Sequence, residues 1–130
     1  KISKNVSDAI KLLKFGAPLN LIVLAFIIYL GPKAGAYHWA FFAVSSVFLS
    51  LTQPAVGMAF SLSNAGKALT SFNLLLFIGA FALQWIIGVI IDLTMNLGYS
   101  EISGFRFAMM FFLLTSFFSY LFFLIRNYKN

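Results

Sequence analysis

The sequence predicts an all-α integral membrane protein with four transmembrane helices. Hydrophobic residues make up 62% of its 130 residues and charged residues only 9%, whereas about a quarter of the residues of a soluble domain are charged. Four uncharged runs are long enough, at about 1.5 Å per helical residue, to cross a bilayer. We therefore expect one partial membrane domain over residues 1–130, with spans at about 12–31, 37–62, 66–92 and 106–126.

Composition also excludes several classes of protein. The chain has no cysteine, so no disulfide or cysteine zinc site is expected. Its net charge of +6 comes from bases at the ends of the apolar runs, a pattern typical of membrane topology and not of nucleic-acid binding. The single histidine, His38, lies at a span boundary, and no carboxylate lies inside a span. We therefore expect no enzyme activity, no metal and no cofactor.

The first span is uncharged from Phe15 to Leu30, and its one strongly polar interior residue is Asn20. Pro18 costs little if the helix begins nearby, and it kinks the helix if the helix begins earlier. The run Gly31–Gly35 holds a proline between two glycines, so it is predicted to end the span in a turn.

The second span carries small and polar residues at helical spacing. Pro54, near its middle, cannot donate a hydrogen bond to the Ser50 carbonyl, so we expect a kink there, favoured also by Gly57. A carbonyl freed inside a bilayer must be met by protein or water. The polar stripe of this span consists of Ser46, Ser50, Gln53, Gly57 and Ser61.

The third span follows a short predicted cytoplasmic loop, Ser63–Lys67, that contains Gly66 and Lys67. One stripe of this span holds small and amide residues, which lipid cannot satisfy, so the stripe should face other helices or a wet cavity. The stripe consists of Gly66, Thr70, Asn73, Phe77, Ala80, Gln84 and Gly88. Two interpretations stay open, because these amides could hold helices together or could border a solute path. The candidate path residues of the two spans are Ser46, Ser50, Gln53, Asn73 and Gln84.

The fourth span follows a polar connection, Thr94–Gly104, and is dominated by phenylalanine. Its polar atoms are hydroxyls, which can bond back to carbonyls of their own helix. The second and third spans have stripes that bear amides, whereas the first and fourth have almost none. This difference predicts that the middle pair faces the working interior and that the outer pair faces lipid as a support.

Basic residues are distributed unevenly between the two sides of the predicted bundle. Four spans put both ends of the chain on one side, which holds seven of the nine bases. The other side holds Lys33 and Arg106, and Arg106 could pair with Glu101 or Asp92. Because the basic side of a membrane protein faces the cytoplasm, both termini are predicted to be cytoplasmic. The seven bases are Lys1, Lys4, Lys11, Lys14, Lys67, Arg126 and Lys129.

The segment TQPAVGMAFSLSNAGKALTSFNLLLFIGAFALQWIIGVIID covers the second and third spans and their junction. It resembles the tenth and eleventh helices of bacterial major facilitator superfamily transporters. The likeness depends on the pair Gly66-Lys67 before the eleventh helix, and on Gln84, Trp85 and Gly88 within it. The resemblance places the whole chain at helices nine to twelve, in the C-terminal six-helix half of a twelve-helix transporter.

The resemblance implies a fragment of a secondary active transporter that moves a small solute by alternating access, in a bacterial inner membrane. Its partners would be the lipid bilayer, the remaining helices of the parent transporter and the solute, and a coupled ion stays open. The chain begins at Lys1 without a methionine, as expected of a fragment. In the family the tenth helix lines the central cavity, and the ninth and twelfth are outer supports.

Two other classes stay open. One is a self-contained four-helix exporter of the small multidrug type, which needs an acid embedded in the membrane that this chain does not supply. The other is a membrane scaffold or assembly subunit, in which the polar stripes serve only to pack helices together.

Overall fold

The chain is helical nearly throughout in the computed structural model, which describes residues 4–128, with side chains from 7 to 127. Four segments are long and apolar enough to span a membrane. The predicted all-α membrane class with four spans is therefore confirmed. The elements are α1 (Lys4–Leu30), the 3-10 helix η1 (Gly31–Lys33), α2 (Ala36–Ser50), α3 (Thr52–Ala59), α4 (Leu62–Asn96) and α5 (Glu101–Tyr128).

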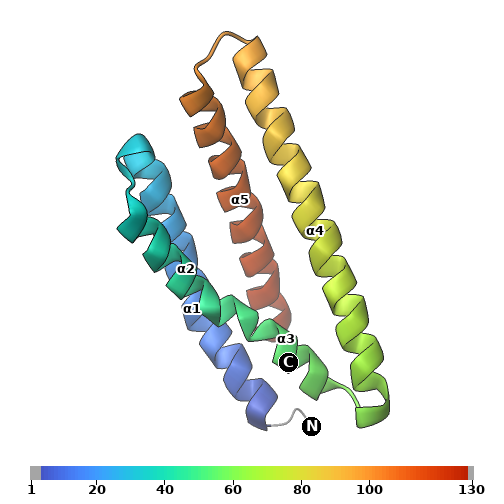
Figure 1. The fold of residues 1–130 in the computed structure, drawn as a ribbon. Helices are drawn as coiled ribbons and strands as arrows, with labels where there is room; N and C mark the ends of the chain where they lie inside the picture. The colour runs from blue at the N-terminus through green and yellow to red at the C-terminus, as the bar shows by residue number, and fades with distance from the viewer. Residues whose placement is uncertain (1–3, 129–130) are drawn as a thin grey trace.

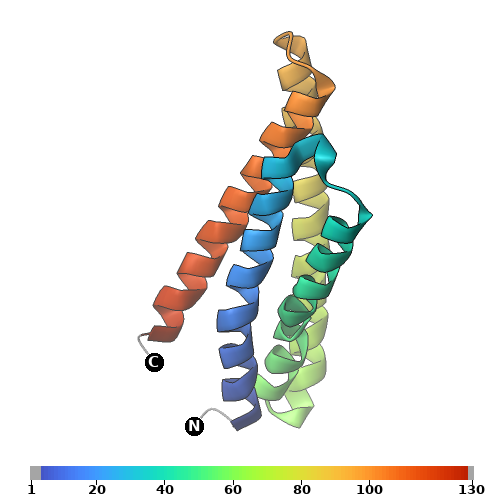
Figure 2. The same cartoon turned by 90° about the vertical axis from the view of Figure 1, so that its left-hand side faces the viewer.

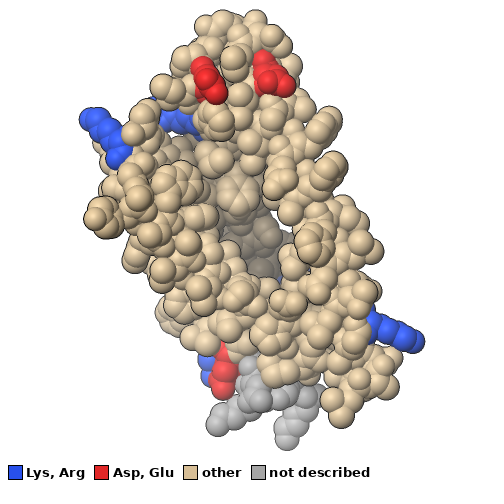
Figure 3. All heavy atoms as spheres, viewed as in Figure 1, with Lys and Arg blue, Asp and Glu red and all other residues tan. Residues whose placement is uncertain are grey.

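The spans run alternately up and down, so both ends of the chain lie at the same end of the bundle (Figure 1, Figure 2). α1 rises to the turn at η1, α2 and α3 return, α4 rises again and α5 returns (Figure 1). On the face seen in Figure 3, charged side chains lie toward the two ends and a broad middle zone is uncharged. This distribution is the one that a bilayer requires.

α1 is the most buried span, and it contacts α2, α3 and α5. The buried share of its hydrophobic segment is 33%, against 0% for α4. The expectation that the first span faces lipid and the third faces the interior is therefore wrong for the described chain. The bundle is held largely by apolar residues of α1, namely Ala9, Leu13, Val23, Leu24 and Ile27, together with Ala108 of α5.

Small residues allow the closest helix contacts. A Cβ on Gly16 of α1 would lie 2.1 Å from the Cβ of Phe48 on α2, so the two backbones approach too closely there for any larger residue. Gly104 of α5 lies against the backbone of Ile91 on α4, and Ala108 one turn later is fully buried. In a membrane such small residues favour packing because they let helix backbones come close.

The junction before α4 differs from the predicted loop at 63–67. α4 begins at Leu62, so Gly66 and Lys67 lie in its first two turns, where both are exposed. The backbone at Ser61 is extended, and its carbonyl accepts two N–H groups of the first turn at 2.8 Å each. These bonds start the helix earlier than the polar composition of the segment suggests.

The connection between α4 and α5 is shorter than the predicted 94–104, because α4 continues to Asn96 and α5 begins at Glu101. Gly98, with φ of 85°, closes α4. The Tyr99 N–H then reaches back to the Thr94 carbonyl at 3.2 Å, which is the bond of a Schellman motif. α1 likewise begins earlier than expected, at Lys4.

Arg106 contacts α1 and forms no ion pair with Asp92 or Glu101, contrary to the expectation for these charges. Its Nε donates to the Ile28 carbonyl at 3.2 Å and its Nη2 to the Tyr29 carbonyl at 2.9 Å. These carbonyls end α1 and lack helical partners, so a cation there is favoured by both hydrogen bonding and the helix dipole. Arg106 therefore ties the start of α5 to the end of α1.

The second span is interrupted at Leu51, between α2 and α3, which confirms the predicted kink. Pro54 cannot donate to the Ser50 carbonyl. The two nearest hydroxyls do not replace that bond, since Ser50 donates to the Val47 carbonyl and Thr52 to the Leu49 carbonyl. Beyond the break α3 turns toward α4, which it contacts (Figure 1).

Candidate functional site

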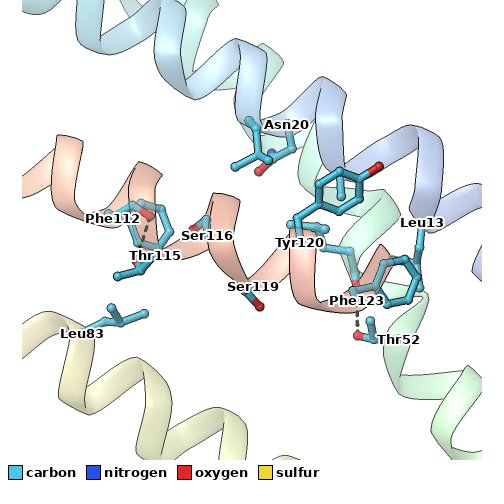
Figure 4. A pocket seen from close by; sticks show the side chains of 13 residues that line it. Leu13, Asn20, Thr52, Leu83, Phe112, Thr115, Ser116, Ser119, Tyr120 and Phe123 are labelled. Carbon is cyan, nitrogen blue, oxygen red and sulfur yellow. Dashed lines mark hydrogen bonds between the residues drawn. The ribbon is translucent and has the colours of Figure 1, made fainter. Parts of the chain in front are cut away.

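A cavity of about 450 Å³ lies between α1 and α5, with α2, α3 and α4 contributing single residues to its wall. Figure 4 shows it from close by, and Figure 3 shows a hollow between α2 and α4 on the face of the molecule. Its volume lies in the range of small-molecule sites, about 300–1,000 Å³. The lining residues, all uncharged, are Leu13, Ala17, Asn20, Leu21, Leu49, Thr52, Leu83, Phe112, Thr115, Ser116, Ser119, Tyr120 and Phe123.

The cavity lies halfway along the bundle. Asn20 is the central residue of the Ser7–Lys33 span, and Thr115 is one residue from the centre of the Glu101–Asn127 span. In a bilayer of matching thickness both would lie near the midplane, where lipid offers no hydrogen-bond partners. Polar groups at this depth must be satisfied by protein or by whatever enters the cavity.

Asn20 joins the cavity to α2. Its Nδ2 lies 2.8 Å from the Ser45 Oγ and 2.9 Å from the Ser46 Oγ. Both serine hydroxyls donate to the Phe42 carbonyl, at 2.8 and 2.9 Å. Because their own protons are used there, the serine oxygens accept the two amide protons of Asn20, and this arrangement fixes which amide atom is nitrogen.

Tyr120 of α5 meets a carbonyl that Pro18 leaves free. Proline at position 18 cannot donate to the carbonyl of Lys14, four residues earlier. The Tyr120 hydroxyl donates to that Lys14 carbonyl at 2.9 Å. This bond explains why α1 continues through Pro18 without a break, whereas the second span breaks near Pro54.

The remaining hydroxyls of the wall differ in whether they are already bonded. Thr115 donates to the Phe111 and Phe112 carbonyls of its own helix, at 3.1 and 3.0 Å. The hydroxyls of Ser116 and Ser119 have no hydrogen-bond partner among the described residues and line the cavity. They are therefore the hydroxyls of this wall that remain available to a bound molecule.

The break in the second span borders the cavity. Leu49 precedes the break on α2 and Thr52 follows it on α3, and both residues line the cavity. A change of angle between α2 and α3 would therefore alter the shape of the cavity directly. Pro54 and Gly57 lie just beyond, and Gly57 packs against Leu69 of α4, where a Cβ would approach to 3.3 Å.

The five path residues expected from the sequence do not come together at the cavity, and none of them lines it. Ser46 lies behind the wall, where its hydroxyl accepts a hydrogen bond from the lining residue Asn20. Ser50 is exposed and donates to its own helix. Gln84 is exposed beside the lining residue Leu83, and no described residue is hydrogen-bonded to its amide.

Gln53 and Asn73 lie next to each other, as their similar distance from the α3–α4 junction suggested. The Gln53 Nε2 donates to the Asn73 Oδ1 at 3.3 Å. This bond joins α3 to α4 on an exposed side of the bundle. The geometry therefore fits helix packing better than a solute path for this pair.

Two weak features of the sequence could have predicted the cavity wall. Asn20 is the one strongly polar interior residue of the first span, and hydroxyls recur along the fourth span at positions 115, 116, 119 and 120. A single amide on an otherwise apolar helix, opposite a hydroxyl-bearing helix, could have identified it. The second and third spans together hold more amides than this pair, so amide content alone favoured them.

Within the described residues, no group of three His, Cys, Asp or Glu side chains could hold a metal ion. No family model, curated protein or solved structure matches the chain.

Proposed function

We propose that this chain is part of a secondary active transporter, in which the cavity forms part of the path of a small solute across the membrane. The observation that carries the proposal is the position of the cavity. The Asn20 amide and the unbonded hydroxyls of Ser116 and Ser119 line the cavity around mid-span depth. Polar groups at this depth do not stabilise a membrane protein unless something binds them. The charge-free wall makes proton relay or hydrolysis a poor fit.

Two further features support alternating access. The interrupted span lies at the cavity wall, and broken helices at solute sites are common in transporters. The resemblance of the α3–α4 junction to helices ten and eleven of the major facilitator superfamily favours the same function. In that case the remaining helices of a parent transporter would cover the exposed face of α4, in a bacterial inner membrane with both termini cytoplasmic.

A membrane scaffold is the second candidate, and the Gln53–Asn73 hydrogen bond favours it. In a scaffold the amides would serve only to join helices, and lipid chains would fill the cavity. The two functions differ in whether water and solute reach the cavity from both sides of the membrane.

A cysteine placed in the cavity separates these functions without knowledge of the solute. The chain has no cysteine of its own, so Ser116→Cys introduces a single thiol into the wall. Thiols react as thiolates, which require water. In an alternating-access transporter, an impermeant thiol reagent should label Ser116→Cys both in intact cells and in inside-out vesicles.

The matched control is Leu114→Cys, an exposed position of the same helix at similar depth. It should remain unlabelled from either side, because lipid surrounds it. Absence of labelling of Ser116→Cys from both sides, in protein that is inserted at the normal level, would overturn the transport proposal and favour the scaffold. Labelling from one side only would also contradict alternating access.

A further inference from the structure

We infer that the cavity binds a neutral amphipathic molecule that donates one O–H or N–H hydrogen bond to the Asn20 side-chain oxygen. The inference names the solute class for the proposed transport function and rests on that function. It depends on three properties of the wall: its lack of charge, one free acceptor on α1, and a predominance of apolar surface.

The absence of charge selects against ions. None of the lining residues carries a formal charge. Lys14, the basic residue nearest to Asn20 along α1, is not part of the wall, and its backbone carbonyl accepts the Tyr120 hydroxyl. A charged group at mid-span depth without a counter-charge would lose its hydration and gain no ion pair. A neutral molecule avoids this penalty.

The free acceptor is the Asn20 Oδ1. Asn20 is only 7% exposed, and its nitrogen is held by Ser45 and Ser46 on α2. No described residue donates to its oxygen, although the side chain lines the cavity. This oxygen is open to the cavity, because no fully enclosed side-chain nitrogen or oxygen among the described residues lacks a hydrogen-bond partner. At mid-span depth lipid supplies no donor, so a donor on a bound molecule would satisfy it. The required donor is an O–H or N–H group.

The opposite wall adds a second polar contact. Ser116 and Ser119 of α5 offer hydroxyls that have no partner among the described residues, and each can donate or accept. The hydroxyls of Thr115 and Tyr120 are already used. A ligand hydroxyl between α1 and α5 could therefore donate to Asn20 and accept from Ser116. Figure 4 shows these labelled side chains on the two facing helices.

The rest of the wall is apolar and requires an apolar body in the ligand. Leucine side chains come from α1, α2 and α4, and Phe112 and Phe123 come from α5. The cavity volume of about 450 Å³ is large enough for a small organic molecule. Apolar surfaces of this kind gain from expelling water in favour of a hydrocarbon or aromatic group. The ligand class is therefore a medium-sized neutral alcohol or amide.

Photolabelling of the full chain in lipid nanodiscs tests the inference with 3-azioctanol, a neutral photoreactive alcohol. After irradiation, trypsin releases the two walls as separate peptides, 15–33 from α1 and 107–126 from α5, and 68–106 from α4 serves as reference. Saturable labelling should concentrate on the first two peptides. Octan-1-ol at about ten times its own Kd should lower it about tenfold, because probe and competitor share one site.

Two competitors isolate the chemistry. 1-Methoxyoctane has no donor, and octanoate carries a charge, so neither should displace the probe as octan-1-ol does. Asn20→Leu should abolish the advantage of the alcohol, whereas Gln84→Leu, at an exposed amide outside the cavity, should preserve it. The competitor series uses the unaltered chain, so it remains decisive even if Asn20→Leu fails to fold.

Diffuse labelling of all three peptides, or equal displacement by all three competitors, would overturn the inference. If Ser116→Cys reacts from both sides but labelling is not saturable, the solute class is wrong and transport stands. If labelling is saturable but Ser116→Cys does not react from both sides, the binding site is supported and transport is overturned.

Discussion

Tyr120 shows how a single side chain can decide whether a proline breaks a helix. Its hydroxyl reaches across 106 residues of sequence to the carbonyl that Pro18 frees. In lipid that carbonyl has no water to bond, so the alternative to Tyr120 is an unsatisfied group or a break in the helix. The bond also joins the two helices that form most of the cavity wall.

We therefore predict that Tyr120→Phe destabilises the protein by about 1 kcal/mol, the usual net value of one hydrogen bond. The cost should largely disappear in a Pro18→Ala background, because alanine restores the N–H that reaches the Lys14 carbonyl. Unfolding in mixed detergent micelles measures both backgrounds. An equal cost of Tyr120→Phe with and without Pro18 would show that the hydroxyl does not act through this carbonyl.

Among the elements, α3 is a short helix of eight residues that packs against both α1 and α4. It follows the break at Leu51 and lies against α4 through Gly57 and the Gln53–Asn73 amide pair. None of these three residues lines the cavity. The amide pair therefore sets the position of α3 and so acts on the cavity only through the neighbouring Thr52.

Gln53→Ala and Asn73→Ala are each expected to lower stability by about 0.6 kcal/mol, the average for hydrogen bonds between helices in a membrane. Each single variant removes the same hydrogen bond, so the double variant should lose no more stability from this bond than either single variant does. Gln84→Ala, at an amide without a described partner, is the control and should cost nothing. Thermal unfolding in detergent gives these values.

A different result would restore the path interpretation of this pair. If the two substitutions leave stability unchanged but alter labelling of the cavity by the photoreactive alcohol, the amides contact the solute. In that case the α3–α4 side of the bundle, and not the α1–α5 cavity alone, would form the path.

At the scale of the whole molecule, the alternating spans place the α1–α2 and α4–α5 turns at one end and the α3–α4 junction at the other (Figure 1). The side that holds the junction also holds most of the basic residues. We predict that this side is cytoplasmic, because positively charged segments are retained there during insertion.

Single cysteines in the cysteine-free chain measure this orientation in intact cells. An impermeant thiol reagent should label Gly35→Cys and Ser100→Cys, which lie at the two outer turns, and should not label Ser63→Cys or Asn127→Cys. After the cells are opened, the second pair should react as well, which controls for expression. Labelling of Ser63→Cys in intact cells would show that the orientation is opposite to the predicted one.

Local sequence determined the number of spans, their alternation and the break near Pro54. These properties follow from the length of apolar runs, from the positions of charges and from residues that cannot donate a backbone hydrogen bond. The proximity of Gln53 and Asn73 also followed, because both are counted from the same junction. Helix ends were less well predicted, since Ser61 and Gly98 set them through individual backbone bonds.

Only the tertiary structure decided which helix lies at the centre and where the cavity lies. In a soluble protein an apolar face points inward, but lipid accepts apolar surface on every side, so hydrophobicity does not distinguish the inner face of a membrane helix. The partners that select it are distant in sequence: Asn20 and Ser45 are 25 residues apart, and Lys14 and Tyr120 are 106 apart. Close approach at Gly16 brings α2 to Asn20, and Pro18 requires a donor from α5. These contacts place α1 at the centre, which the count of amides on each helix did not indicate.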